Sequence, residues 1–435
     1  MGGVLGLNYR EHNCIGDLQD GIFQLQHRGQ EHCGFATVGN RLHCECYPGL
    51  VSVNTNAEQL EKFPGKSGLA HVSLSDPQPL VLESRLGKMA LVFDGVINNA
   101  REIKQELLQQ GCAFAYGTDG EIMARLISQG KDIVDGLAGL PDRIRGAYSL
   151  LVLTEKGQLF AMRCPAGIRP LVIGINDAGT CAASESGTLD WLGVKEFKDV
   201  EPGAIYELKT SGFAKVAERP AQKIAHCAFE YAYMARIDAI IDGVPVSQAR
   251  NNFGSALAAR DQSVNADVVA GVPMSGLGHA LGYHLASQVP YGIVFDYNRY
   301  AHGRSYIPPT QTERKRIATS KLYIVKEAVK GKRIVLCDDS IVRGTQIAHR
   351  VDELMNAGAR EVHVRIGAPK LSYPCKYSIS ARTPEELIGN QRTEDEICAI
   401  LGATSLHYNT VDDFVKAIGL PIEKLCLACW LGNDH

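Results

Sequence analysis

The sequence lacks a long hydrophobic segment, a strong excess of charge of either sign and a P-loop signature. No apolar run in the 435 residues approaches the roughly 20 that a transmembrane helix needs. A net charge of −3 gives no electrostatic argument for binding nucleic acid or an anionic membrane. The N-terminal segment has no basic region followed by a long apolar core, so it is not predicted to be a secretory signal. These absences predict a cytoplasmic protein whose partners include neither nucleic acid nor a membrane.

The most informative segment is 334–346, which reads Ile-Val-Leu-Cys-Asp-Asp-Ser-Ile-Val-Arg-Gly-Thr-Gln. It predicts a short buried strand, a polar loop and a helix start, whose unpaired N–H groups and positive potential suit a phosphate. Asp338 and Asp339 would repel a bare phosphate, but they suit sugar hydroxyls or a divalent cation. The segment therefore predicts binding of a sugar phosphate that carries a second, metal-bound phosphate group. The alternative is an ordinary strand-to-helix turn with an Asp cap.

This acidic segment resembles the phosphoribosyl diphosphate (PRPP) loop of type I phosphoribosyltransferases. In that family the acids hold the ribose hydroxyls and the following loop wraps the 5-phosphate. A second strand–loop–helix pattern, Val272-Pro-Met-Ser-Gly276, is a weaker signal, because a plain turn explains it equally well on its own. Beside the acidic loop on one sheet edge, it resembles the loop that takes the pyrophosphate of PRPP. Ser275 would then meet the diphosphate or its Mg²⁺.

Two kinds of pattern divide the chain. Short alternating runs, interrupted by a few helical patterns, predict an α+β layered domain over the first 210 residues. The polar stretch 209–226 is a predicted boundary. After it, strands and helices alternate, which predicts a parallel sheet with its ligand at the carboxyl ends of the strands. Strands are predicted at 2–7, 34–47, 68–73, 88–93, 148–153, 158–162, 170–174, 204–208, 267–272, 333–337 and 361–366, and helices at 17–27, 99–110, 119–129, 277–287 and 345–356.

Longer strings extend the resemblance over nearly the whole chain. The sequence resembles the glutamine PRPP amidotransferase family in Leu25-Gln-His-Arg-Gly-Gln-Glu31, Gly167-Ile-Arg-Pro-Leu171, Ala183-Ser-Glu-Ser186, Phe229-Glu-Tyr-Ala-Tyr233, Asn298-Arg-Tyr300 and Asp338-Asp-Ser-Ile-Val-Arg-Gly-Thr345. The resemblance implies an N-terminal Ntn-hydrolase-like αββα sandwich of the class II glutamine amidotransferase type at 1–218. It implies a type I phosphoribosyltransferase domain with a parallel sheet at 219–435, and a homodimer or homotetramer.

The first domain departs from the family where glutaminase chemistry depends on specific side chains. Gly2 stands in the place of the N-terminal cysteine nucleophile. Ser73 replaces the arginine that grips the glutamine carboxylate. Asp94, followed by Gly95, replaces the asparagine of the oxyanion hole, where a carboxylate would oppose the developing charge. Asp119, which matches the acid that holds the glutamine amine, remains. The resemblance therefore predicts an inactive glutaminase.

The second domain keeps most of the motifs of the transferase. The resemblance assigns the ribose to Asp338 and Asp339, and Mg²⁺ to these two acids and Ser275. It assigns the 5-phosphate to Ser340, Ile341, Val342, Arg343, Gly344 and Thr345, and the pyrophosphate to Pro273, Ser275, Gly276, Arg304 and Lys321. Met274 departs from the family's usual Asp, which removes a charge beside the pyrophosphate. The segment 298–307 resembles the family's mobile loop with one extra residue, and a solvated loop is the alternative for its basic residues.

Thirteen cysteines in a long chain without a secretory signal favour metal or cluster binding over a disulfide framework. The string Cys426-Leu-Ala-Cys429 alone fits a redox pair, a zinc half-site or chance. The resemblance adds Cys227 and Cys375, which match the [4Fe–4S] ligands of some family members, and zinc is the less favoured occupant. The string Cys44-Glu-Cys46 fits either a metal site or simple alternation along a strand.

With the glutaminase lost, three functions remain. The first is transfer of ammonia, free or from a separate ammonia-supplying protein, to PRPP, which gives the 5-phosphoribosylamine of purine synthesis. The second is transfer to another nitrogen acceptor. The third is a regulatory pseudoenzyme that binds PRPP or a nucleotide. The complete acidic motif favours catalysis, whereas Met274 favours the regulator.

Overall fold

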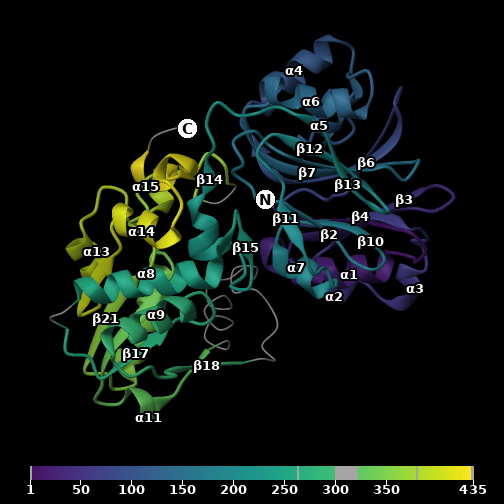
Figure 1. The fold of residues 1–435 in the computed structure, drawn as a ribbon. Helices are drawn as coiled ribbons and strands as arrows, with labels where there is room; N and C mark the ends of the chain where they lie inside the picture. The colour runs from purple at the N-terminus through teal and green to yellow at the C-terminus, as the bar shows by residue number, and fades with distance from the viewer. Residues whose placement is uncertain (1, 262–263, 299–321, 379–380, 433–435) are drawn as a thin grey trace.

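The structure, a computed structural model, describes residues 2–261, 264–298, 322–378 and 381–432. Figure 1 shows two layered units, one built from the purple and blue N-terminal part of the chain and one from the green and yellow C-terminal part. Within the described residues, no helix combines the length and the apolar character that crossing a membrane requires.

Two antiparallel sheets form the first unit. The larger sheet contains seven strands in the order β11 (Phe197–Asp199), β9 (Val172–Ile175), β10 (Gly179–Ala183), β1 (Gly2–Tyr9), β4 (Ser67–Ser73), β2 (His32–Val38) and β3 (Leu42–Pro48). The smaller sheet contains six strands in the order β13 (Gly212–Glu218), β12 (Ala204–Lys209), β8 (Leu159–Arg163), β7 (Gly146–Thr154), β6 (Gly87–Ile97) and β5 (Leu80–Ser84).

Side chains that alternate along the strands fill both faces of each sheet. On β1, Val4 packs in the layer between the two sheets, whereas Leu5 and Leu7 pack on the opposite face. The strand is therefore buried on both sides, which explains why residues 2–7 carry no polar side chain. Helices cover the outer faces, namely α1 (Ile15–Gln24), α2 (Val51–Asn54), α3 (Ala57–Leu60) and α7 (Ser186–Trp191) on the seven-stranded side and α4 (Ala100–Gln109), α5 (Asp119–Ser128) and α6 (Ile133–Arg143) on the other.

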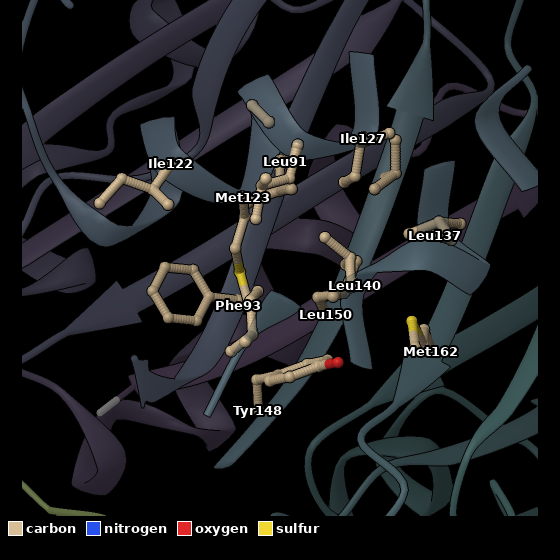
Figure 2. Packing of buried hydrophobic residues seen from close by; sticks show 14 of the residues in the cluster. Leu91, Phe93, Ile122, Met123, Ile127, Leu137, Leu140, Tyr148, Leu150 and Met162 are labelled. Atoms are coloured by element: carbon tan, nitrogen blue, oxygen red, sulfur yellow. The ribbon is translucent and has the colours of Figure 1, made fainter. Parts of the chain in front are cut away.

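Figure 2 shows how the smaller sheet is covered. Side chains of α5 and α6 pack onto apolar residues of β6, β7 and β8; the labelled ones are Leu91, Phe93, Ile122, Met123, Ile127, Leu137, Leu140, Tyr148, Leu150 and Met162. The order of layers is thus helix, sheet, sheet, helix, which is the predicted αββα sandwich.

A parallel sheet forms the centre of the second unit. Its four strands lie in the order β17 (Val268–Gly271), β20 (Arg333–Asp338), β21 (Glu361–Ile366) and β22 (Ser405–Tyr408). The helices of this unit are α8 (Val246–Arg260), α9 (Leu277–Ser287), α11 (Lys326–Val329), α12 (Thr345–Asn356), α13 (Glu394–Leu401), α14 (Val411–Ile418) and α15 (Ala428–Leu431). Ile334 and Leu336 of β20 pack on one face with α12 and α13, and Val335 and Cys337 pack on the other with α8 and α9.

Short strand pairs complete the second unit. They are β14 (His226–Cys227) with β23 (Leu425–Cys426), β15 (Ile240–Ile241) with β16 (Val244–Pro245), and β18 (Phe295–Tyr297) with β19 (Leu322–Ile324). The first pair is parallel, and its hydrogen bonds join the C-terminal segment to the start of the second unit. A π-helical turn, Glu230–Met234, follows β14.

One prediction about the elements was wrong. The run 34–47 is a hairpin of β2 and β3 and not a single strand, because the polar residues 39–41 form the turn between them. The stretch 209–226, predicted as a boundary, contains β13, which extends the smaller sheet. This strand lies at the sheet edge and its side chains stay largely in solvent, so its sequence carries no apolar alternation.

A buried ion pair joins the two units. Arg163, at the end of β8, donates to Asp242 Oδ1 at 2.7 Å and to Oδ2 at 2.9 Å, and also to the carbonyl oxygen of Gly167 at 2.7 Å. Burial opposes ionisation of Asp242, but Arg163 outweighs burial and lowers the pKa of this carboxyl. The pair thus supplies charge and acceptors to a guanidinium that has no access to water.

We expect Asp242→Asn to lower the free energy of unfolding by about 3 kcal/mol at neutral pH, because Arg163 would keep a buried charge without its counter-charge. A depressed pKa contributes stability above the ordinary range of an aspartate, and this contribution is lost as the pH falls. The difference between variant and wild type should therefore shrink in acid. Denaturant unfolding measures it. Glu102→Gln is the control, because its pair with Arg145 is exposed, and equal effects of the two variants would contradict the assignment.

Candidate functional site

Two loops at the carboxyl edge of the parallel sheet form the core of the candidate site. The loop 272–276 follows β17, and the loop 339–344 follows β20. These strands are hydrogen-bonded neighbours, with Gly271 opposite Cys337. The sequence-predicted residues of the two loops therefore lie together at the edge where parallel sheets bind ligands.

Backbone contacts clamp the first loop onto β20. Val272 N donates to the carbonyl oxygen of Cys337 at 2.9 Å, and Gly276 N donates to that of Val272 at 2.8 Å. A Cβ atom on Gly276 would lie 2.3 Å from the Cys337 oxygen, so only glycine allows this approach. Gly276 also precedes α9, which places Pro273 and Ser275 at the start of that helix.

Hydroxyl and amide groups hold the two carboxylates in place. Ser275 Oγ donates to Asp338 Oδ1 at 2.9 Å, and the backbone N–H of Asp339 donates to the same oxygen at 2.9 Å. The Ser340 hydroxyl donates to the Asp339 carboxylate. Asp339 is only 5% exposed. Ser275 of the first loop thus contacts Asp338, the last residue of β20, directly.

The chemistry of this pair suits a divalent cation. Burial first, and then the neighbouring Asp339, raise the pKa of Asp338 well above its usual value, and burial also raises the pKa of Asp339. A hard cation with oxygen ligands would relieve this unfavourable charge. Within the described part of the chain, no group of three or more His, Cys, Asp or Glu side chains could hold a metal ion. A cation at this pair would therefore need further ligands from water or substrate, as Mg²⁺ commonly does.

The second loop ends at the start of α12. Gly344 has φ +80°, and a Cβ there would lie 2.6 Å from Ile388 Cδ1, so the turn requires glycine. Thr345 begins the helix, whose first N–H groups face the loop without intrahelical partners. Ile341 is buried, and Val342 accepts a hydrogen bond from Ile388 N at 2.7 Å. The Arg343 guanidinium forms an ion pair with Glu386, so its charge is already balanced by that carboxylate.

One residue near the carboxylates escaped the sequence analysis. Arg250 of α8 is 5% exposed and donates to the carbonyl oxygens of Tyr231 at 3.0 Å and Ala235 at 2.7 Å. Its charge offsets part of the rise that burial causes in the pKa of Asp339. An arginine among the apolar residues of a helix is the signal that would have identified it.

The remaining transferase positions differ in what the structure says of them. Met274, in the first loop, is 70% exposed. Arg304, Lys321 and the insertion Ala301–His302 lie outside the described residues.

The four cysteines proposed as cluster ligands come from three separate segments. Cys227 of β14 is the register partner of Cys426 of β23, and Cys429 follows on α15. The Cys429 carbonyl accepts hydrogen bonds from the N–H groups of residues 372 and 373, which brings the segment of Cys375 beside it. Burial raises the pKa of Cys227 and of Cys429, and the charges of the other thiols raise both further. The donors therefore suit a thiolate-bound cluster in kind and location, although the described side chains do not meet as a preformed metal group.

Gly2, the first of the glutaminase positions, lies in a space that a side chain cannot share. A Cβ atom there would lie 2.4 Å from the Val72 carbonyl oxygen and 2.5 Å from His71 Nε2. The backbone N–H of Gly2 donates to Asp94 Oδ1 at 3.0 Å. Strand β1 therefore fits against β4 only as long as this position has no side chain.

Asp94, in the position of the oxyanion-hole asparagine, belongs to a buried ionic cluster. Arg28 lies 3.4 Å from Asp94, 2.5 Å from Glu185 and 2.6 Å from Glu230. Burial opposes ionisation of Asp94, but Arg169 and Arg28 outweigh it and lower its pKa. An ionised carboxylate presents negative charge at the position for which the sequence resemblance predicts the hydrogen-bond donor of an oxyanion hole.

The other glutaminase positions give no replacement for these groups. Ser73 is buried, and its hydroxyl has no hydrogen-bond partner among the residues that the structure describes. Gly95 leaves no room for a side chain, since a Cβ there would lie 2.1 Å from the Ala147 carbonyl oxygen. Asp119 accepts a hydrogen bond from Ile97 N at 3.0 Å, and burial raises its pKa.

Comparison with known proteins places these features in a family. Residues 69–190 match the model of the glutamine amidotransferase domain. The chain is 39% identical to the amidophosphoribosyltransferase of Methanothermobacter thermautotrophicus over 95% of this chain and 89% of that protein. It is 37% identical to the amidophosphoribosyltransferase of Bacillus subtilis over 95% of this chain and 90% of that protein.

A solved structure agrees in fold over both units. Glutamine PRPP amidotransferase from B. subtilis, complexed with ADP and GMP, superimposes with a TM-score of 0.91 at 36% identity, covering 99% of this chain and 96% of that chain. This agreement confirms the predicted fold class.

We expect Asp339→Asn to stabilise the ligand-free protein at pH 8, because it removes one of two adjacent buried carboxylates. A raised carboxyl pKa costs stability as the pH rises above the unfolded value, by about 1.4 kcal/mol for each pKa unit. The advantage of the variant should disappear in acid, where both carboxyl groups are protonated in either state. Unfolding curves across this pH range measure the effect, with Asp412→Asn as control, because Asp412 is an exposed residue of α14. A variant that is less stable at every pH would contradict the repulsion.

We expect Gly2→Cys to cost about 1–3 kcal/mol of stability and to give no glutamine hydrolysis, because the added side chain would collide with β4. Gly16→Cys is the matched control, since a Cβ at that position meets nothing within 4 Å. Denaturant unfolding and glutamate release are the measurements. A stable Gly2→Cys protein that releases glutamate from glutamine would show that this position can still take the nucleophile.

Proposed function

Because the chain belongs to the amidophosphoribosyltransferase family, we propose that it transfers the phosphoribosyl group of PRPP to ammonia or another nitrogen nucleophile without hydrolysing glutamine itself. The hydrogen bond from Ser275 to Asp338 is the observation that carries this proposal. It joins the loop assigned to pyrophosphate with the loop assigned to ribose, so both ends of the bond that breaks would be held by one rigid sheet edge.

The proposed roles follow the chemistry of each group. Asp338 and Asp339 would accept hydrogen bonds from the ribose hydroxyls, and the N–H groups from Ser340 to Thr345 would hold the 5-phosphate at the start of α12. Pro273, Ser275 and Gly276 would receive the pyrophosphate, together with Arg304 and Lys321. Ser275 and the two aspartates would hold Mg²⁺, which when bound neutralises charge on the departing diphosphate.

The reaction needs few groups from the protein beyond these. The nitrogen lone pair attacks C1 of the ribose, the bond from C1 to the pyrophosphate oxygen breaks, and the pyrophosphate leaves with the bonding electrons. Attack from the face opposite the leaving group inverts C1. Positioning and charge neutralisation supply most of the rate enhancement, because the transition state resembles an oxocarbenium ion. Ammonia brings its own lone pair and needs no general base on the protein.

The nitrogen source in this proposal lies outside the chain. The collision of a side chain at Gly2 and the ionised Asp94 oppose hydrolysis of glutamine. Free ammonia or a separate ammonia-supplying protein would then provide the nucleophile, with 5-phosphoribosylamine of the purine pathway as the product. Cys227, Cys375, Cys426 and Cys429 would hold a [4Fe–4S] cluster, or zinc less readily, that ties the C-terminal segment to the first strand of the second unit.

Further features belong to the same proposal. The boundary between the glutaminase-like and transferase domains falls after Glu218, where β13 ends. The protein acts in the cytoplasm as a homodimer or homotetramer.

A second candidate function rests on Met274. This exposed thioether occupies the pyrophosphate loop without supplying a charge or a hydrogen-bond donor. A regulatory protein that binds PRPP or a nucleotide without turnover would tolerate such a residue. Turnover distinguishes the two candidates.

We expect the anaerobically purified protein to release pyrophosphate from PRPP and Mg²⁺ when ammonia is present, and not with glutamine alone. Asp338→Asn should abolish this release, because it removes a carboxylate assigned to both ribose and metal. Binding of PRPP without pyrophosphate release under any condition would favour the regulator. Release of glutamate and pyrophosphate together from glutamine would contradict the inactive glutaminase.

A further inference from the structure

Two cysteines on an edge strand lie outside the features described so far. Cys44 and Cys46 belong to β3, the last strand of the seven-stranded sheet. Residues two apart on a strand project from the same face, so the two thiols are neighbours. Both donate to a single acceptor, the carbonyl oxygen of Pro79, at 3.4 Å from Cys44 Sγ and 3.6 Å from Cys46 Sγ.

The surroundings leave room for both sulfur atoms. Gly34 is the register partner of Cys46 on β2, and a Cβ there would lie 2.9 Å from Cys46 Sγ. Glycine thus makes the space that the sulfur occupies. Both cysteines are half-buried, so reagents in solution can reach them. The intervening Glu45 accepts a hydrogen bond from Tyr47 Oη at 2.5 Å, which commits its carboxylate away from the thiols.

The two thiols also interact with each other. A hydrogen bond from Cys44 lowers the pKa of Cys46, against the effect of burial. The same bond, and then burial, raise the pKa of Cys44. The two sulfur atoms therefore lie within hydrogen-bonding reach of each other, so that one cation can contact both.

We propose that Cys44 and Cys46 form a two-sulfur binding site for a soft monovalent cation of the Cu(I) class. Binding forms two sulfur–metal bonds and releases the two thiol protons to solvent, with no change in oxidation state. The site shares no residue with the transferase loops, the glutaminase positions or the four proposed cluster cysteines.

The geometry favours this occupant over the alternatives. Zinc and iron–sulfur clusters take four ligands, and within the described part of the chain no third His, Cys, Asp or Glu completes a group around the pair. Soft thiolates select Cu(I). A disulfide is disfavoured because residues two apart on an extended strand lie about 6.6–6.8 Å apart, at the upper limit of the Cα separation that a disulfide spans.

Peptide mapping tests the site without interference from other cysteines. Trypsin cleavage after Arg41 and Lys62 yields a peptide, 42–62, whose cysteines are Cys44 and Cys46 alone. The reduced full-length protein is incubated anaerobically with Cu(I), or with Zn²⁺ in a parallel sample. It is then alkylated in the native state and analysed by mass spectrometry. We expect Cu(I) to protect both cysteines together, and Zn²⁺ at the same concentration to protect neither.

The variants separate chelation from simple thiol binding. In Cys44→Ser, protection of Cys46 should need about 100-fold more Cu(I), because the second sulfur no longer raises the effective concentration. Cys112→Ser, in a different tryptic peptide, should leave the protection of 42–62 unchanged. Equal Cu(I) protection of Cys46 with and without Cys44 would overturn the proposal, as would equal protection by Zn²⁺. If Cys44→Ser folds poorly, the Cys46→Ala variant tests the same point independently, with protection of Cys44 from alkylation as the measurement.

Discussion

The buried guanidinium of Arg28 is the interaction on which the relation between the two units depends. It lies among Asp94 and Glu185 of the first unit and Glu230 of the second. A charge without access to water requires counter-charges in fixed positions, and removing one of them is costly. This requirement keeps Asp94 in its ionised form, and the Asp94 carboxylate in turn accepts a hydrogen bond from the N–H of Gly2. The start of the chain, the glutaminase positions and the first turn after β14 are thereby held in one arrangement.

The buried charges constrain the predicted site of the first domain, whereas the predicted site of the second domain depends on backbone geometry. Under the proposed function, the first domain offers neither a nucleophile nor a neutral donor for an oxyanion, because Asp94 is engaged with Arg28 and Gly2 packs against the Val72 carbonyl oxygen. In the second, the loops after β17 and β20 keep their form through backbone contacts and through Gly276 and Gly344, which no other residue could replace without strain. On this account a binding edge built from main-chain geometry persists, while the first domain serves as a scaffold that supports it.

Local patterns predicted the elements whose apolar residues repeat with a clear period. The helices 277–287 and 345–356 and the strand 361–366 have the predicted bounds, because apolar periodicity and the flanking glycines mark them. The hairpin at 34–47 was read as a single run because β-type residues lie on both sides of its short turn, and the edge strand β13 carries little periodicity because its side chains are largely exposed. The proximity of the two loops could be argued from parallel topology, but the role of Arg250 depends on how α8 packs. A side chain at Gly2 would collide with β4 because β1 and β4 are paired at this point. The sequence alone does not reveal which strands are neighbours, so the collision could not be predicted from it.

The origin of the transferred nitrogen tests the central claim most directly. PRPP and Mg²⁺ are supplied with ¹⁵N-ammonium and unlabelled glutamine together, and the isotope content of the amine product is measured by mass spectrometry. The account predicts that the product nitrogen carries the label of the ammonium, with no dilution as glutamine is increased. Dilution in proportion to glutamine would contradict it, because nitrogen would then pass through the first domain.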